Sequence, residues 1–253
     1  GAGGVADAGE YERLRRNGAL HNLDTVDWSI FDRYRREHDE GDAVFWFTLE
    51  GFFWFPRTLF GIEGHLFSFY DSPELLKQMN QDQTDFSLRI LERLLKEDPI
   101  EFMTFAEDMS YNHGAMISEE LFDEFMLPYY RQVIPLLKEH GVKVFVDSDG
   151  DVSECIGWFR RAGVEGILPL ERQAGVDVAA LRERYPDFLF MGGYDKTVMH
   201  RGESAVRNEF ERLARQGGFF VSCDHQTPPE VSLNDYRLYL ELFREYAGKA
   251  VEA

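Results

Sequence analysis

Acidic side chains and two histidines follow the ends of several apolar runs, and these positions are where we expect chemistry. The candidates, in chain order, are Glu50, Glu107, Asp108, Tyr111, His113, Asp147, Asp149, Glu171, Asp195, Cys223 and His225. Carboxylates and imidazoles in such a group can hold a divalent cation, or they can pass protons as general acid and base. Scattered surface acids would have no reason to collect there, so the pattern predicts an active site.

The densest of these segments is Asp147-Ser-Asp149-Gly-Asp151. It resembles the start of a calcium loop, but Trp158 stands at the twelfth position, where such a loop has a glutamate. The aspartates could instead cap the helix predicted to follow them. At an extended strand end Asp147 and Asp149 share one side, which suits two metal ligands or an acid/base pair.

The histidines also leave alternatives open. His225 lies two residues after Cys223, so it is either a metal ligand beside a thiol or a structural histidine with satisfied hydrogen bonds. His113 is either a turn residue or a substrate contact. The aromatic stretch that holds Trp54 and Arg57 is too long for a plain turn, and it predicts the wall of a pocket for a flat or apolar ligand.

Six apolar runs of strand length must position these side chains. They span residues 43–49, 100–106, 142–146, 166–170, 188–191 and 219–222. Helical patterns lie between them at 118–126, 153–162, 178–184 and 203–216, and a further one follows the last run at 233–246. Such alternation predicts βαβ units around a parallel sheet, whose carboxyl-terminal strand ends carry the active site. We therefore expect an α/β fold of the (β/α)8 TIM-barrel type, with six of the eight units visible.

Composition limits the partners. The chain has 27 basic and 46 acidic residues and a formal net charge of −19, so nucleic acid and anionic membrane are excluded as main partners. No apolar run reaches the ~18 residues of a membrane span, and the two cysteines suggest free thiols in the cytoplasm. We expect a charged helical segment over residues 1–40, frayed over 1–11, and a barrel domain over 41–253.

Several segments resemble the uroporphyrinogen decarboxylase superfamily. They are ISEELFDEFMLPYY (117–130), VKVFVDSDGDV (142–152), AGVEGILPLE (162–171), FLFMGGYDK (188–196) and GGFFVSCDHQTPPEVSLNDY (217–236), with a weaker match at 43–64. The resemblance implies a (β/α)8 barrel in which residues 43–49 form the third strand, so that the first two strands are missing from this chain. A homodimer or the N-terminal helical segment would then cover the open sheet edge.

One branch of this superfamily, the cobalamin-dependent methyltransferases, moves methyl groups between a corrinoid and a thiol. It holds zinc with a His-x-Cys pair after the fifth barrel strand and a cysteine after the eighth. In this chain Asp147 and Asp149 stand at the first two positions and His225 at the third, with Cys223 close by. The resemblance therefore implies methyl transfer involving a corrinoid or a methylated substrate, with a corrinoid protein as partner. Asp147, Asp149 and His225 would hold a divalent metal such as zinc, or would form a metal-free acid/base set.

The other branch implies decarboxylation of uroporphyrinogen or a similar polycarboxylate, with His225 and Tyr111 as polar contacts and Arg57 as anion anchor. A non-catalytic or partner-completed binding barrel is the third hypothesis. Across the enzymatic hypotheses the expected catalytic residues are His225, Asp149, Asp108 and Tyr111. The expected substrate-binding residues are Arg57, Trp54, Glu107, His113, Glu171 and Asp195.

Overall fold

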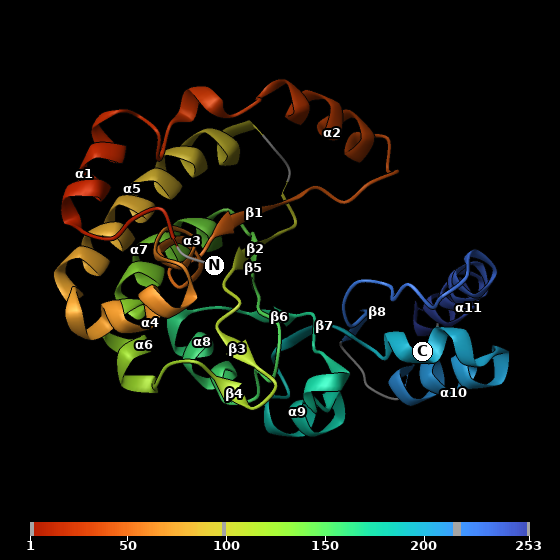
Figure 1. Ribbon diagram of the computed structural model, residues 1–253. Coiled ribbons are helices and arrows are strands. Elements are labelled where there is room, and N and C mark those ends of the chain that lie inside the picture. Colours follow the sequence, from red (N-terminus) through yellow and green to blue (C-terminus); the bar gives the residue numbers. More distant parts are fainter. Residues whose placement is uncertain (1–2, 98–99, 215–218, 252–253) are drawn as a thin grey trace. The chain divides into compact units, whose positions relative to one another are not determined.

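The computed structural model describes residues 3–97, 100–214 and 219–251 (Figure 1). The chain divides into two compact units. The first contains Gly1–Met109, Met116–Asp147 and Gly157–Glu165, and the second contains Ser110–Ala115, Ser148–Ile156 and Gly166–Ala253.

The first unit is built on three parallel strands. They are β1 (Trp46–Glu50), β2 (Phe102–Ala106) and β5 (Lys143–Asp147), in the order β1-β2-β5. Three consecutive central residues are buried in β2 and in β5, as expected for strands covered on both faces. In β1, which lies at the edge, Leu49 alone is buried.

Helices surround these strands. They are α1 (Ala8–Arg16), α2 (Ser29–Asp39), α3 (Trp54–Phe60), α4 (Ile62–Asp71), α5 (Pro73–Glu97), α6 (Glu119–Phe125) and α7 (Leu127–Glu139), with a short 3-10 turn, η1 (Leu23–Thr25). The helix α8 (Cys155–Ala162) begins in the second unit and ends in the first. The aromatic ring of Tyr130 on α7 meets Phe105 of β2 edge-on, with ring centroids 5.2 Å apart. Such contacts fix the helices on the sheet.

The N-terminal residues are ordered, so the expected fraying is wrong for the described part of residues 1–11. The amides of Gly3 and Val5 donate to the carbonyls of Phe60 and Leu59. Val5 and Tyr11 are buried in a cluster with Phe55, Leu75 and Met79. The apolar surface that these side chains remove from water holds the terminus in place.

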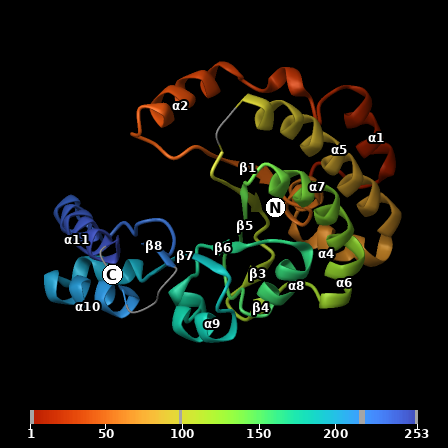
Figure 2. The same cartoon turned by 180° about the vertical axis from the view of Figure 1, so that it is seen from behind.

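The second unit has its own parallel strands, β6 (Gly166–Leu168), β7 (Leu189–Tyr194) and β8 (Phe219–Cys223), paired in that order. A small hairpin joins β3 (Ser110–Tyr111) to β4 (Gly114–Ala115). The remaining elements are η2 (Arg172–Ala174), α9 (Val178–Arg184), η3 (Lys196–Arg201), α10 (Glu203–Ala214) and α11 (Leu233–Val251). The helices α10 and α11 lie side by side in both views (Figures 1 and 2).

The six parallel strands coincide with the six predicted runs, and helices separate them as predicted. The α/β fold of the TIM-barrel type is therefore confirmed, with six strands of such a barrel in the described residues. The helix predicted over 203–216 ends at Ala214, and its last two positions lie outside the described residues. The domain boundary at residue 40 stays a prediction.

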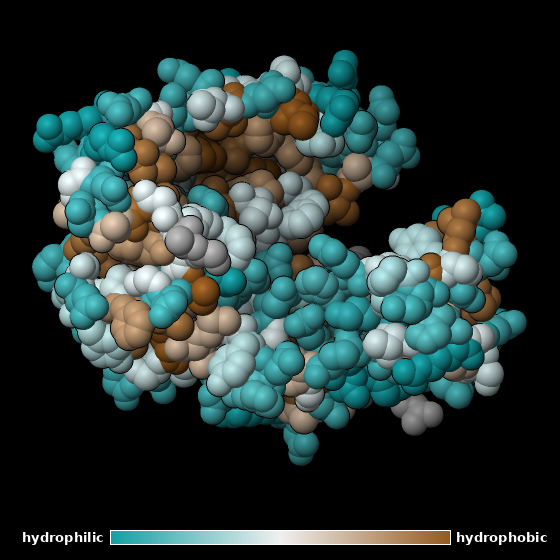
Figure 3. Space-filling view, in the orientation of Figure 1, coloured by the Kyte–Doolittle hydropathy of each residue, from teal (hydrophilic) through white to brown (hydrophobic). Residues whose placement is uncertain are grey.

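The two units differ in surface character. In Figure 3 apolar residues gather in a hollow of the first unit near α2 and α5, whereas the visible face of the second unit is mainly hydrophilic. Exposed apolar side chains of the first unit include Tyr34, Val44 and Trp46. None of the helices in the described ranges is long and apolar enough to cross a membrane.

Candidate functional site

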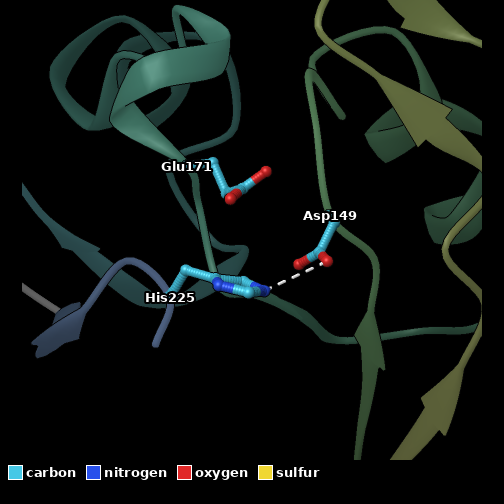
Figure 4. Close-up of side chains that lie close together, drawn as sticks. All are labelled: Asp149, Glu171 and His225. Atoms are coloured by element: carbon cyan, nitrogen blue, oxygen red, sulfur yellow. Dashed lines mark hydrogen bonds and ion pairs between the residues drawn. The ribbon is translucent and has the colours of Figure 1, made fainter. Parts of the chain in front are cut away.

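Three of the predicted site residues lie together in the second unit: Asp149, Glu171 and His225 (Figure 4). Asp149 follows the end of β5 along the chain, Glu171 follows β6, and His225 follows β8. One ligand atom from each of them lies within 4.8 Å of the other two. The Nε2 atom of His225 is 3.2 Å from Oδ2 of Asp149, and 35% and 39% of these two side chains is exposed. A small molecule can therefore reach them.

Backbone bonds hold the turn that carries Asp149. The amide of Gly150 donates to Oε2 of Glu171 at 2.9 Å, and the amide of Asp151 donates to the carbonyl of Tyr111 at 2.9 Å. Gly150 has φ +84°, and a Cβ atom there would lie 2.7 Å from the backbone nitrogen of Tyr111. The turn thus requires glycine, both for its left-handed conformation and for its close packing on the β3–β4 hairpin.

Lys196 and Asp224 extend the cluster. Asp224 follows the sixth predicted strand, but neither residue was among the predicted catalytic, substrate-binding or metal-binding residues. Nζ of Lys196 lies 3.3 Å from Oε1 of Glu171 and 4.0 Å from Oδ1 of Asp224. The Asp224 side chain is fully buried and accepts hydrogen bonds from the amides of Arg172 and Lys196, at 2.9 and 3.1 Å. Burial raises the pKa of Asp224, although these backbone donors and the Lys196 charge oppose the rise. Asp224 therefore fixes the turns after β6 and β7.

The donor set fits a divalent cation. Two carboxylates and an imidazole are ligands that zinc and harder divalent ions accept. Asp149, Glu171 and Asp224 bring three negative charges and Lys196 one positive charge. The acidic groups thus outnumber the basic one, and a divalent ion would offset part of this excess.

This candidate ligand set differs in one member from the one predicted, because it contains Glu171 in place of Asp147. Asp147 is the last residue of β5 in the first unit, where its carbonyl accepts the amide of Glu107 at 2.9 Å. Cys223, the optional fourth ligand, is outside the cluster. Burial raises the pKa of its thiol, which disfavours the thiolate that a metal would need.

Glu107, expected to contact substrate, holds the start of α3 in the first unit. It is fully buried, and its carboxylate accepts the amides of Phe52, Phe53 and Trp54 at 2.8, 2.7 and 3.2 Å. The hydroxyl of Tyr130 donates to the same carboxylate. Burial raises the pKa of Glu107 to about 7, with these four donors acting in the opposite direction. These contacts hold the start of α3 against β2 and α7.

Arg57, Trp54 and Asp108 lie together, also in the first unit. The guanidinium carbon of Arg57 is 5.0 Å from the centre of the Trp54 ring, and Nη1 donates to the carbonyl of Asp108 at 2.8 Å. Asp108 has φ +42°, an uncommon conformation for a residue other than glycine. A hollow of about 210 Å³ is lined by Trp54, Arg57, Thr58, Gly61 and Ile62.

The other predicted residues have local partners in the second unit. Tyr111 and His113 are exposed on the β3–β4 hairpin, with ring centroids 5.7 Å apart. Asp195 caps η3 by accepting the amide and hydroxyl of Thr197, and it also accepts Nε2 of Gln173. Although burial raises the pKa of Asp195, these donors outweigh it and the net shift is downward. Asp195 is thus occupied in holding a turn.

The comparisons with known proteins agree with this architecture. Residues 60–246 match the family model described as uroporphyrinogen decarboxylase. Among solved structures, a methyltransferase from Methanosarcina mazei is similar with a TM-score of 0.65 and 13% identity, over 86% of this chain and 64% of that one. The chain therefore spans 64% of the length of that structure, and at this identity the likeness shows the fold alone. A comparison with curated proteins returned no match. Because the family model covers most of the sequence, the chain belongs to the uroporphyrinogen decarboxylase family.

Proposed function

We propose that this chain is an enzyme of methyl transfer that binds one divalent metal ion through Asp149, Glu171 and His225. The observation that carries the proposal is the convergence of these three ligand atoms within 4.8 Å. The excess of carboxylates over cations around these atoms supports it. The methyltransferase fold of the solved relative is consistent with it.

The residues of the cluster have separate tasks. A bound divalent ion would supply a Lewis acid at the site. Asp149 and Glu171 would hold it by charge, and the backbone amide of Gly150 orients Glu171 for this purpose. His225, with Nε2 facing Asp149, would donate that nitrogen as a neutral imidazole. The methyl group would come from, or go to, a corrinoid presented by a corrinoid protein.

Metal content tests the site directly. We expect purified wild-type protein to bind one equivalent of Zn²⁺ or Mn²⁺, and Asp149→Asn and His225→Gln to bind it at least about tenfold more weakly. Glu230→Gln is the matched control, because it removes an exposed carboxylate five residues after His225. If Asp149→Asn binds the ion as tightly as wild type does, the assignment of the site is wrong.

The reaction is tested with methylcobalamin and a set of thiol, amine and hydroxyl acceptors. Wild-type protein loaded with metal should accelerate the loss of the methylcobalamin absorbance, and His225→Gln should not. If wild-type protein binds metal but is inactive with every acceptor, the assignment of the metal site stands, and methyl transfer from a corrinoid is ruled out as the reaction.

Decarboxylation of uroporphyrinogen or a similar polycarboxylate is the second candidate, and Arg57 favours it. Its guanidinium borders the hollow of about 210 Å³ and can pair with a carboxylate. If wild type releases CO₂ from uroporphyrinogen and Arg57→Gln releases it more slowly, the function is decarboxylation rather than methyl transfer.

A further inference from the structure

Lys196 is a cation enclosed within the acidic cluster. Only 17% of its side chain is exposed, and its Nζ lies 3.3 Å from Oε1 of Glu171. The other oxygen of Glu171 accepts the amide of Gly150 at 2.9 Å. Both oxygens of the carboxylate therefore have a donor, and a metal ion that binds Glu171 must compete with one of them.

The two donors differ in how easily they can yield. The amide of Gly150 belongs to a left-handed turn packed against the backbone of Tyr111, so it cannot move without disrupting that turn. The ammonium of Lys196 lies at the end of a flexible four-carbon chain. It can withdraw from Glu171 and keep Asp224 as its counter-ion, since Oδ1 of Asp224 is already 4.0 Å away.

We propose that Lys196 is an internal counter-ion that competes with the divalent metal for Glu171 and so makes the bound ion readily exchangeable. This inference rests on the proposed function. In the absence of the ion Lys196 keeps the Glu171 carboxylate paired. The ion gains Glu171 only by displacing Lys196, and this displacement lowers its affinity. Lys196 is thus a positioning residue that sets metal affinity.

The test is a titration of the full chain, freed of metal with a chelator, with Mn²⁺ by isothermal calorimetry. Lys196→Met should bind Mn²⁺ about tenfold more tightly than wild type, because the competing charge is removed. Lys196→Arg keeps a cation beside Glu171 and should stay close to wild type. Arg201→Gln removes a positive charge from η3, where the Arg201 guanidinium contacts Thr197, and should shift the affinity by less than about twofold.

The outcomes are distinct because structural damage would weaken binding, whereas the proposal requires it to strengthen. The inference is wrong if Lys196→Met binds Mn²⁺ as tightly as wild type or more weakly. It is also wrong if Arg201→Gln gains as much affinity for Mn²⁺ as Lys196→Met does, because the effect would then come from long-range charge rather than from competition for Glu171. If Lys196→Met binds Mn²⁺ and wild type does not, the inference is supported. If neither protein binds Mn²⁺, both the inference and the proposed metal site are wrong. If Lys196→Met binds Mn²⁺ more tightly but wild type shows no methyl transfer, the inference about Lys196 stands and the proposed reaction is wrong. If Lys196→Met does not fold, as judged by circular dichroism, Lys196→Gln takes its place.

Discussion

Glu107 shows how one ionisable residue can be tied to the fold. Its carboxylate lies where water cannot reach and meets three backbone amides and the Tyr130 hydroxyl. Burial of a charged group is unfavourable, and hydrogen bonds to the charged form recover only part of that cost. The net result is the raised pKa of Glu107, of about 7.

This raised pKa predicts a pH dependence of stability. The unfolded state loses the Glu107 proton near pH 4.5, whereas the native state keeps it up to about pH 7. Between these values the native state binds more protons, so this residue makes the free energy of unfolding fall as the pH rises. The fall is on the order of 3 kcal/mol.

Urea unfolding of wild type and Glu107→Gln between pH 4 and pH 8 measures the effect. The variant should be less stable overall, because an amide presents an NH₂ group to backbone donors. The difference between the two proteins should shrink as the pH rises. Parallel pH profiles for the two proteins would show that Glu107 does not titrate in this range.

At this scale the sequence indicated residue types but not their partners. Glu107 and Glu171 each follow a strand, and both were predicted to contact substrate. The difference between them comes from contacts across long stretches of chain: Glu107 meets the amides of 52–54, and Glu171 meets Lys196. The spacing of residues in a sequence does not show such contacts. The balance of charge could have indicated Lys196, since clustered carboxylates require a nearby cation.

The segment between β1 and α3 is the first element whose geometry can be tested. Gly51 lies against the buried Glu107, and a Cβ atom at position 51 would be 2.1 Å from Cδ of that carboxylate. We expect Gly51→Ala to lower the free energy of unfolding by more than about 3 kcal/mol, because neither group can move aside.

Gly64→Ala is the matched control, since its Cβ would be 3.5 Å from the nearest atom, on Phe60, within α4. It should be neutral or stabilising by up to about 1 kcal/mol. Thermal melting monitored by circular dichroism compares the two variants. Equal melting temperatures for Gly51→Ala and Gly64→Ala would show that the segment between β1 and α3 can make room for the added Cβ atom.

The turns after β6 and β7 are joined by Asp224. An Asp224→Asn variant keeps one acceptor but loses the charge that faces Lys196, so we expect destabilisation of about 1–3 kcal/mol. Hydrogen exchange should also accelerate at the amides of Arg172 and Lys196, which donate to this side chain. Unchanged exchange at both amides would argue against a role of Asp224 in joining the turns.

The strands and most helices were predictable because their apolar periodicity is a local property. The terminus was not: residues 1–11 are small and polar enough to resemble a frayed end, yet Val5 and Tyr11 are buried. Their burial depends on α3 and α5, which lie far away in the sequence. Intrinsic composition is overridden here by tertiary packing.

At the scale of the whole molecule, β1 forms an edge of the parallel sheet within the described residues. Val44, which precedes β1, and Trp46, its first residue, are 60% and 46% exposed. The Trp46 ring stacks on Phe102 with ring centroids 5.1 Å apart. Unpaired edge strands with apolar side chains favour association. We propose that a second copy of the chain covers this edge in a homodimer.

Sedimentation velocity should therefore give a dimer for wild type. Trp46→Lys should shift it to a monomer at micromolar concentration, because a charge on an edge strand opposes pairing. Tyr70→Lys is the control, since Tyr70 is an exposed aromatic residue on α4. A monomeric wild type would contradict the proposed dimer. A Trp46→Lys variant that stays dimeric would show that the dimer forms through another surface.

The support of the turns in the second unit also bears on which ions the proposed metal site could come to prefer. Asp224 and Gly150 fix the turns through backbone amides, so the support does not depend on which side chains stand at 149 and 225. A single nucleotide change can exchange the carboxylate at 149 for an imidazole, or the imidazole at 225 for a carboxylate, while the turns persist. With the proposed site, a lineage on this scaffold could thus shift its preference among divalent ions by one substitution at a time.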